Sequence, residues 1–151
     1  MTGPDLRFDS DAELDALVRA FERGEAAPVA GFTHQAHLAV ALAYLERYGL
    51  QAATSRMRQG LLAFLRRALG DDAAAQVRYR ETITVFWLRL LAAALAGTDA
   101  RRPLHERVNA LLVRYRDATV IRRYYSEARL YAPEARDRFL EPDLRPLPPL
   151  P

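Results

Sequence analysis

Apolar residues recur along most of this chain at spacings of three and four positions, the period of one face of an α-helix. Stretches with this pattern are bounded by glycine, proline or capping residues such as Ser10 and Thr33, so they predict separate helices. A further helical element starts at Asp71 or Asp72 and continues into the helix expected over residues 79–96. The expected helices cover residues 10–24, 33–49, 50–69, 79–96 and 103–115, with short ones at 119–125 and 133–140.

Only one stretch has the composition of a β-strand. Ile83, Thr84 and Val85 are β-branched neighbours, but they lie inside an apolar pattern of helical period, so we interpret them as helix. Short connections between apolar-faced helices favour antiparallel packing. The sequence therefore predicts an all-α fold, a compact helical bundle of about four to six helices. We expect one domain over residues 1–144, followed by a proline-rich tail at 145–151.

The composition limits the available chemistry. The chain has 151 residues, enough for one domain with its own core, and it contains no Cys, while all 22 of its basic residues are Arg. Disulfides, thiolate nucleophiles and lysine Schiff bases are therefore excluded. Two Ile, one Asn and no Lys are typical of a GC-rich bacterial genome. Any catalysis must come from His, carboxylate, Tyr or a bound cofactor, and no motif indicates an organic cofactor.

The charge pattern does not favour nucleic acid or a membrane. The net charge of +3 is spread over 19 acidic and 22 basic residues that alternate along the chain, so we expect solvated helix faces and no nucleic-acid footprint. Acidic residues stand where a secretory signal would be basic and apolar, and no window has the roughly 20 apolar residues of a membrane span. We therefore expect a cytoplasmic protein.

Two of the three histidines, His34 and His37, stand three residues apart at the start of the helix that Thr33 caps. This spacing places both imidazoles on one helix face, and the helix N-terminus favours their neutral form. Such a pair can ligate one divalent transition metal when a facing helix adds a carboxylate, or it can serve as a general base. The alternative is one capping or core histidine and one surface histidine. We expect the third, His105, at the surface.

Glu81 is the carboxylate that we expect to complete this site. It stands at the edge of a buried apolar stripe, where a carboxylate is paired, ligates a cation or has a raised pKa. The alternative is a surface ion pair with Arg78 or Arg80. Thr82 and Thr84 follow on the same helix as candidate ligand-binding hydroxyls, although threonines in helices also bond back to preceding carbonyl groups.

Four motifs resemble an uncharacterised family of small all-helical bacterial proteins. They are F-x-H-x-x-H-L, then E-T-x-T-x-x-W, then Y-Y-S-x-x-R-L with E-P-D-L-x-P-L, and they cover roughly residues 30 to 147. The resemblance implies a shared helical fold and a shared polar cluster of His34, His37, Glu81, Thr82 and Thr84, but no reaction. In that family a histidine usually precedes the glutamate, whereas this chain has Arg80, which leaves two histidines and one glutamate.

The C-terminal part offers two further candidates. Tyr124 belongs to a tyrosine-rich segment that could line a polar cavity, although tyrosines more often pack with the hydroxyl at the rim. Residues 145–151 have the form R-x-L-P-x-L-P that domains binding polyproline helices recognise. Because such domains are chiefly eukaryotic, we expect a strap lying against the bundle, or a frayed end.

These observations support two hypotheses of different class. In the first, His34, His37 and Glu81 bind a divalent metal or a small ligand, and the protein is a metal-dependent enzyme or a small-molecule binder. In the second, these groups are structural, and the protein is a non-enzymatic interaction or regulatory module. We expect a small molecule or a metal as the partner, with a homodimer as a further option; whether the protein is an enzyme is left open.

Overall fold

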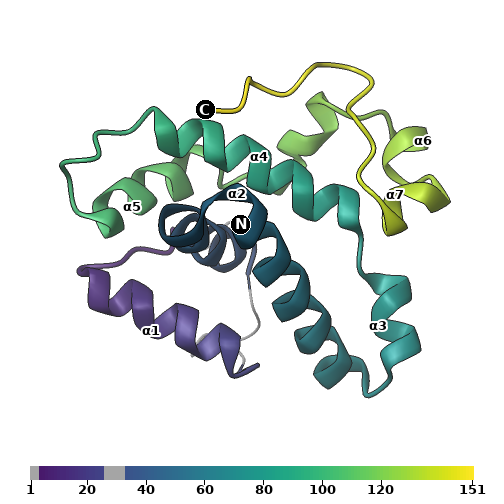
Figure 1. Ribbon diagram of the computed structural model, residues 1–151, viewed down its shortest axis with the longest axis horizontal. Coiled ribbons are helices and arrows are strands. Elements are labelled where there is room, and N and C mark those ends of the chain that lie inside the picture. The colour runs from purple at the N-terminus through teal and green to yellow at the C-terminus, as the bar shows by residue number, and fades with distance from the viewer. Residues whose placement is uncertain (1–3, 26–32) are drawn as a thin grey trace.

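The computed structural model describes residues 4–25 and 33–151, and in these ranges all regular secondary structure is helical (Figure 1). The predicted all-α class is therefore confirmed for the part of the chain described. Within these two ranges, seven α-helices and one 3₁₀ helix, η1, follow one another as α1 (Asp11–Glu22), α2 (His34–Leu69), α3 (Asp72–Arg78), α4 (Glu81–Ala96), α5 (Leu104–Arg114), η1 (Ala118–Arg123), α6 (Glu127–Leu130) and α7 (Pro133–Asp137).

The predicted number of four to six helices is too low, because short helices contain too few turns to show a helical period. α6 has 4 residues and was not predicted, while the element expected to start at Asp71 or Asp72 and to continue to residue 96 is two helices, the 7-residue α3 and the 16-residue α4. The helix expected over 119–125 is the 3₁₀ helix η1, and the one expected over 133–140 ends at Asp137.

The capping residues act as their positions in the sequence predict. The Ser10 side chain accepts a hydrogen bond from Glu13 N, and the Thr33 hydroxyl accepts one from Ala36 N at 3.2 Å. Asp71 caps α3, and Gly70 ends α2 in the left-handed region with φ of 69°. Each cap satisfies a backbone group that the helix itself leaves unpaired.

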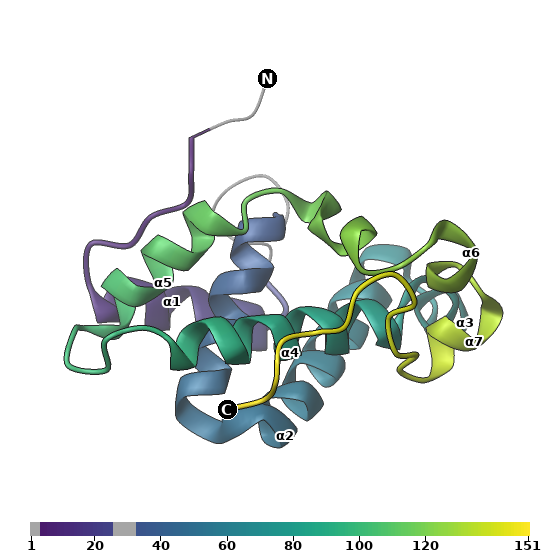
Figure 2. The same cartoon turned by 90° about the horizontal axis from the view of Figure 1, so that it is seen from above.

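Gly49 divides α2 into two arms. Its φ of 80° and ψ of 172° lie outside the helical region, in a conformation that is essentially restricted to glycine. The first arm (residues 34–48) and the second arm (residues 50–69) therefore point in different directions (Figures 1 and 2). The helical conformation is therefore interrupted at Gly49, where the sequence predicts a helix end, and the interruption takes the form of a kink.

α4 is the central element of the core. It packs against α2, α5 and α7, and its aromatic residues Phe86 and Trp87 are buried on different sides of the helix. Their rings meet edge to face at 5.3 Å between centroids. Because α4 is apolar on nearly every face, it has to be covered on all sides, and the two arms of α2 cover much of it.

Both ends of the described chain are fixed to this core. Asn109 on α5 accepts a hydrogen bond from Phe8 N and donates one to Phe8 O, which holds the N-terminal segment. Residues 145–151 form a strap that runs along α4 (Figure 2), with Leu147 packed against the core and the Arg145 guanidinium over the Tyr124 ring. The strap is one of the two arrangements expected for this tail. None of the helices described here combines the length and apolarity needed to cross a bilayer.

Candidate functional site

A cavity of about 460 Å³ lies between the kinked α2, α4 and the η1–α6 region. The first arm of α2 contributes His34 and His37 to its walls, the second arm Met57, and α4 Trp87. η1 and α6 complete the walls with side chains that include Arg122 and Tyr131. Most of the lining side chains are apolar. We call this space the central cavity.

His34 has a defined tautomer. Its Nε2 lies 2.9 Å from the carbonyl oxygen of Tyr115, and because a carbonyl only accepts, Nε2 carries the proton and Nδ1 holds the lone pair. The Trp87 ring packs edge-on at 4.9 Å between centroids. Burial lowers the pKa of His34, although the bond to Tyr115 and the negative charge of Asp117 oppose this effect.

His37, one helical turn further along, is more deeply placed. Burial lowers its pKa to about 4, and repulsion from His34 acts in the same direction. Both imidazoles are therefore neutral near pH 7, in agreement with the prediction, but the main cause is burial and not the helix N-terminus. Because Tyr115 uses the Nε2–H of His34, that ring offers a ligand its Nδ1 lone pair, and His37 contributes a second neutral imidazole to the cavity wall.

Glu81 does not join the histidines. It is not among the described residues that line the central cavity, and its side chain, 14% exposed, faces the second arm of α2. There Arg58 Nε donates to one carboxylate oxygen at 2.9 Å, and the Tyr79 hydroxyl donates to the same oxygen at 2.7 Å. Burial raises the pKa of Glu81, but the hydrogen bonds from Arg58 and Tyr79 outweigh it and the pKa is lowered. Glu81 is thus the paired carboxylate of our alternatives, with Arg58 in place of Arg78 or Arg80.

Of the three candidate ligand-binding residues, Thr82, Thr84 and Tyr124, only Thr84 is among the described residues that line the central cavity. Thr84 lines the central cavity, and its hydroxyl also bonds back to Arg80 O at 3.4 Å. Thr82 is fully buried outside the cavity: its hydroxyl donates to Arg138 O at 2.8 Å and accepts from Leu140 N at 3.2 Å. Tyr124 packs on Phe86 at 5.1 Å between centroids and is likewise not among the described lining residues.

The predicted three-ligand metal site is not assembled. Within residues 4–25 and 33–151, no three His, Asp or Glu side chains come together in a group that could hold a metal ion. His34 and His37 meet at one wall, whereas the Glu81 carboxylate is already neutralised by a guanidinium. The structure therefore brings together two of the three predicted ligands.

Several cavity residues escaped the sequence analysis. Arg122 and Thr119 lie in η1, and Tyr131 directly follows α6; the weak periodicity of such short segments gives no information about the direction of a side chain. Trp87 stands in the E-T-x-T-x-x-W motif, and it both belongs to the buried core and lines the cavity. His105, expected at the surface, is partly buried, and its Nδ1 lies 2.8 Å from Asp11 Oδ1.

Comparisons of this chain with protein-family models, with curated proteins and with solved structures find no match. The resemblance to the helical bacterial family therefore stays a prediction.

Proposed function

We propose that this protein binds a small, largely apolar molecule in the central cavity, with His34 and His37 as the polar groups that orient it. The observation that carries the proposal is the cavity itself. Its volume of about 460 Å³ falls within the range typical of ligand pockets, about 300–1,000 Å³. It also combines apolar walls with a few convergent polar groups, as such pockets do.

The structural origin of the cavity favours ligand binding over loose packing as its explanation. Apolar side chains that line an open pocket of this size stay in contact with water, so a ligand that covers them is favoured by the hydrophobic effect. Here the kink at Gly49 holds the two arms of α2 apart, so the space follows from a specific backbone conformation. A ligand would restore the contacts that the arms cannot make with each other.

The donor set favours a small organic ligand over a metal ion. Two neutral imidazoles share one wall, and the nearest predicted carboxylate partner is held by Arg58. His34 Nδ1 offers an acceptor, and Thr84 and Thr119 add hydroxyl groups to a mainly apolar lining. These groups can orient one polar end of an organic molecule.

The proposal can be tested with N-phenyl-1-naphthylamine, an uncharged fluorophore that brightens in apolar surroundings. We expect saturable binding of one molecule per chain, with a Kd on the order of 10 µM for a probe of this size. Ala118→Phe should weaken binding about tenfold or more, because Ala118 lines the cavity from an exposed position where a larger side chain is tolerated.

Ala128→Phe is the matched control. Ala128 is also exposed, on the neighbouring α6, but it is not among the described lining residues. It should leave the affinity unchanged, and circular dichroism checks that both variants fold. Non-saturable binding, or equal affinity of both variants for the probe, would contradict the proposal.

A further inference from the structure

The central cavity has a single charged side chain among its described lining residues, and that charge has no partner. Arg122 of η1 is exposed at the cavity wall, and no Asp or Glu accompanies it in the described lining. Within the described chain, eleven of the 22 arginines form an ion pair with a carboxylate, as Arg58 does with Glu81, and no carboxylate lies within ion-pair distance of Arg122. An unpaired guanidinium beside an apolar cavity attracts an anionic group.

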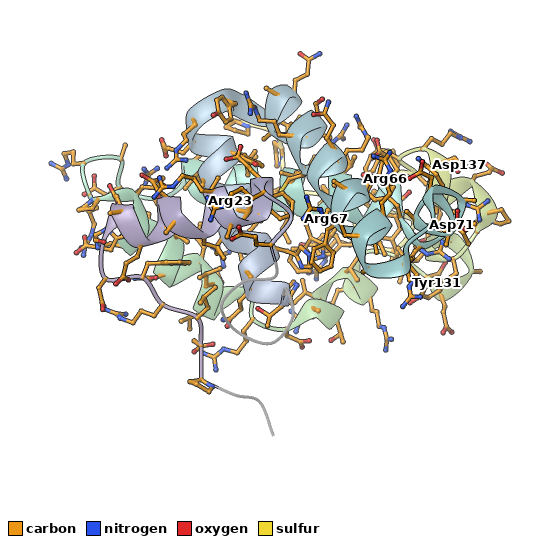
Figure 3. The ribbon with its side chains drawn as sticks, turned by 90° about the horizontal axis from the view of Figure 1, so that it is seen from below. Arg23, Arg66, Arg67, Asp71, Tyr131 and Asp137 are labelled. Atoms are coloured by element: carbon orange, nitrogen blue, oxygen red, sulfur yellow. The ribbon has the colours of Figure 1, made fainter. Side chains whose placement is uncertain are left out.

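The surroundings strengthen this positive character. The Arg80 guanidinium lies over the Tyr131 ring, 5.3 Å from its centroid, and Tyr131 itself lines the cavity. Figure 3 labels Tyr131 at the end of the molecule that also carries Asp71, the capping residue of α3. Arg80, like Arg122, has no ion-pair partner within the described ranges, so a second guanidinium lies against a lining residue of the cavity.

The negative charge of Asp117 acts on the cavity through His34. Asp117 is close enough to His34 to oppose the fall in its pKa, but its carboxylate accepts hydrogen bonds from Thr119 N at 2.9 Å and Thr119 Oγ1 at 2.7 Å. It is therefore directed at the start of η1 and is absent from the described lining. The charge that faces the cavity from η1 is the guanidinium of Arg122.

We infer that the ligand of the central cavity is an amphipathic monocarboxylate, with its apolar body between the arms of α2 and its carboxylate at Arg122. The inference rests on the proposed function and names the class of ligand. A planar guanidinium matches a carboxylate with two parallel hydrogen bonds. The apolar walls elsewhere leave no partner for a second charge, which disfavours dicarboxylates and zwitterions.

The test compares decanoate with decanol, which share the alkyl chain and differ in charge. Each displaces N-phenyl-1-naphthylamine from the wild-type protein at about pH 7.5, where the acid is ionised. We expect decanoate to bind roughly three- to tenfold more tightly than decanol, since the ion pair forms at a partly exposed position. Arg122→Gln should abolish this preference, because it weakens the binding of decanoate more than that of decanol.

Arg123→Gln is the matched control, because Arg123 is the exposed neighbour on η1 and does not belong to the described lining. It should retain the preference for decanoate. No preference in the wild-type protein, or a preference that survives Arg122→Gln, would overturn the inference and leave the proposed function standing. If neither compound displaces the probe, the proposed function itself fails.

Discussion

Burial determines the protonation of the two cavity histidines. The pKa of His37 falls to about 4 mainly because the charged imidazolium loses hydration in the apolar wall, and His34 shifts in the same direction. At neutral pH the cavity is therefore uncharged on the side of α2, and its charge is confined to Arg122. The cavity therefore has a cationic end at Arg122 and a neutral wall on α2 in which His34 and His37 are the polar groups.

The low pKa of His37 predicts an acid-sensitive stability. The unfolded chain takes up a proton near pH 6.5, whereas the folded protein does so only near pH 4, so the free energy of unfolding falls as the pH drops through this window. The shift corresponds to a loss of about 3 kcal/mol between these two pH values. Urea unfolding of the wild-type protein and of His37→Gln at several pH values measures the effect.

The variant is expected to show a shallower dependence on pH than the wild type between about pH 6.5 and 4, because it lacks the group that titrates. Above about pH 7 the difference between the two proteins should be constant, since His37 is neutral in both the folded and the unfolded state there. Parallel curves through the acid window would show that His37 is not buried as described.

The residue-level predictions succeeded where the helical period alone decides the outcome. Two histidines three residues apart share a face in any helix, and the structure places both at one wall of the cavity. The partner of Glu81 could not be predicted in this way. Arg58 lies 23 residues earlier on another helix, and only the kink of α2 and the packing of its second arm against α4 bring the two together.

At the scale of elements, two glycines determine the kink of α2 and the packing of α1 against it. Gly49 provides the backbone conformation of the kink, while Gly60 on the second arm lets α1 approach closely. A Cβ atom at position 60 would stand 2.3 Å from Phe21 Cε2 of α1, well inside van der Waals contact. The Phe21 ring therefore occupies the space that a side chain at Gly60 would need.

This contact predicts that Gly60→Ala destabilises the protein, although alanine favours the helix more than glycine does. Phe21 is buried and cannot retreat into solvent, so we expect a loss of about 1–3 kcal/mol in the free energy of unfolding. The matched control is Gly97→Ala: there φ is −82° and a Cβ would have ordinary contacts, the nearest at 3.4 Å.

The control should remain within about 0.5 kcal/mol of the wild type. Urea or thermal unfolding of both variants measures the difference, and a stabilising effect of Gly60→Ala would contradict the close packing of α1 on α2. The element boundaries themselves followed from capping chemistry at Ser10, Thr33 and Gly70. The start of α3 followed from its cap Asp71 as well, but the break between α3 and α4 and the presence of α6 did not, because tertiary contacts determine such short segments more than local pattern does.

At the scale of the whole molecule, the central cavity arises from elements far apart in the sequence. The kinked α2 and the central α4 form its body, and the short helices η1 and α6 complete its walls. The apolar pattern predicts which side of each long helix is buried, but it does not say whether facing sides touch or leave space between them. The cavity therefore could not be predicted, and it is the feature on which the proposed function depends.

The chain contains one tryptophan, Trp87, and it lines this cavity, which makes its fluorescence a direct probe of occupancy. The most direct measurement is a titration of the wild-type protein with 10-bromodecanol, whose bromine quenches indole fluorescence on contact. Our account predicts saturable quenching with one molecule bound per chain, reversed by unbrominated decanol. Quenching that rises linearly with the concentration of 10-bromodecanol, as it does for a tryptophan analogue free in solution, would contradict binding in the central cavity.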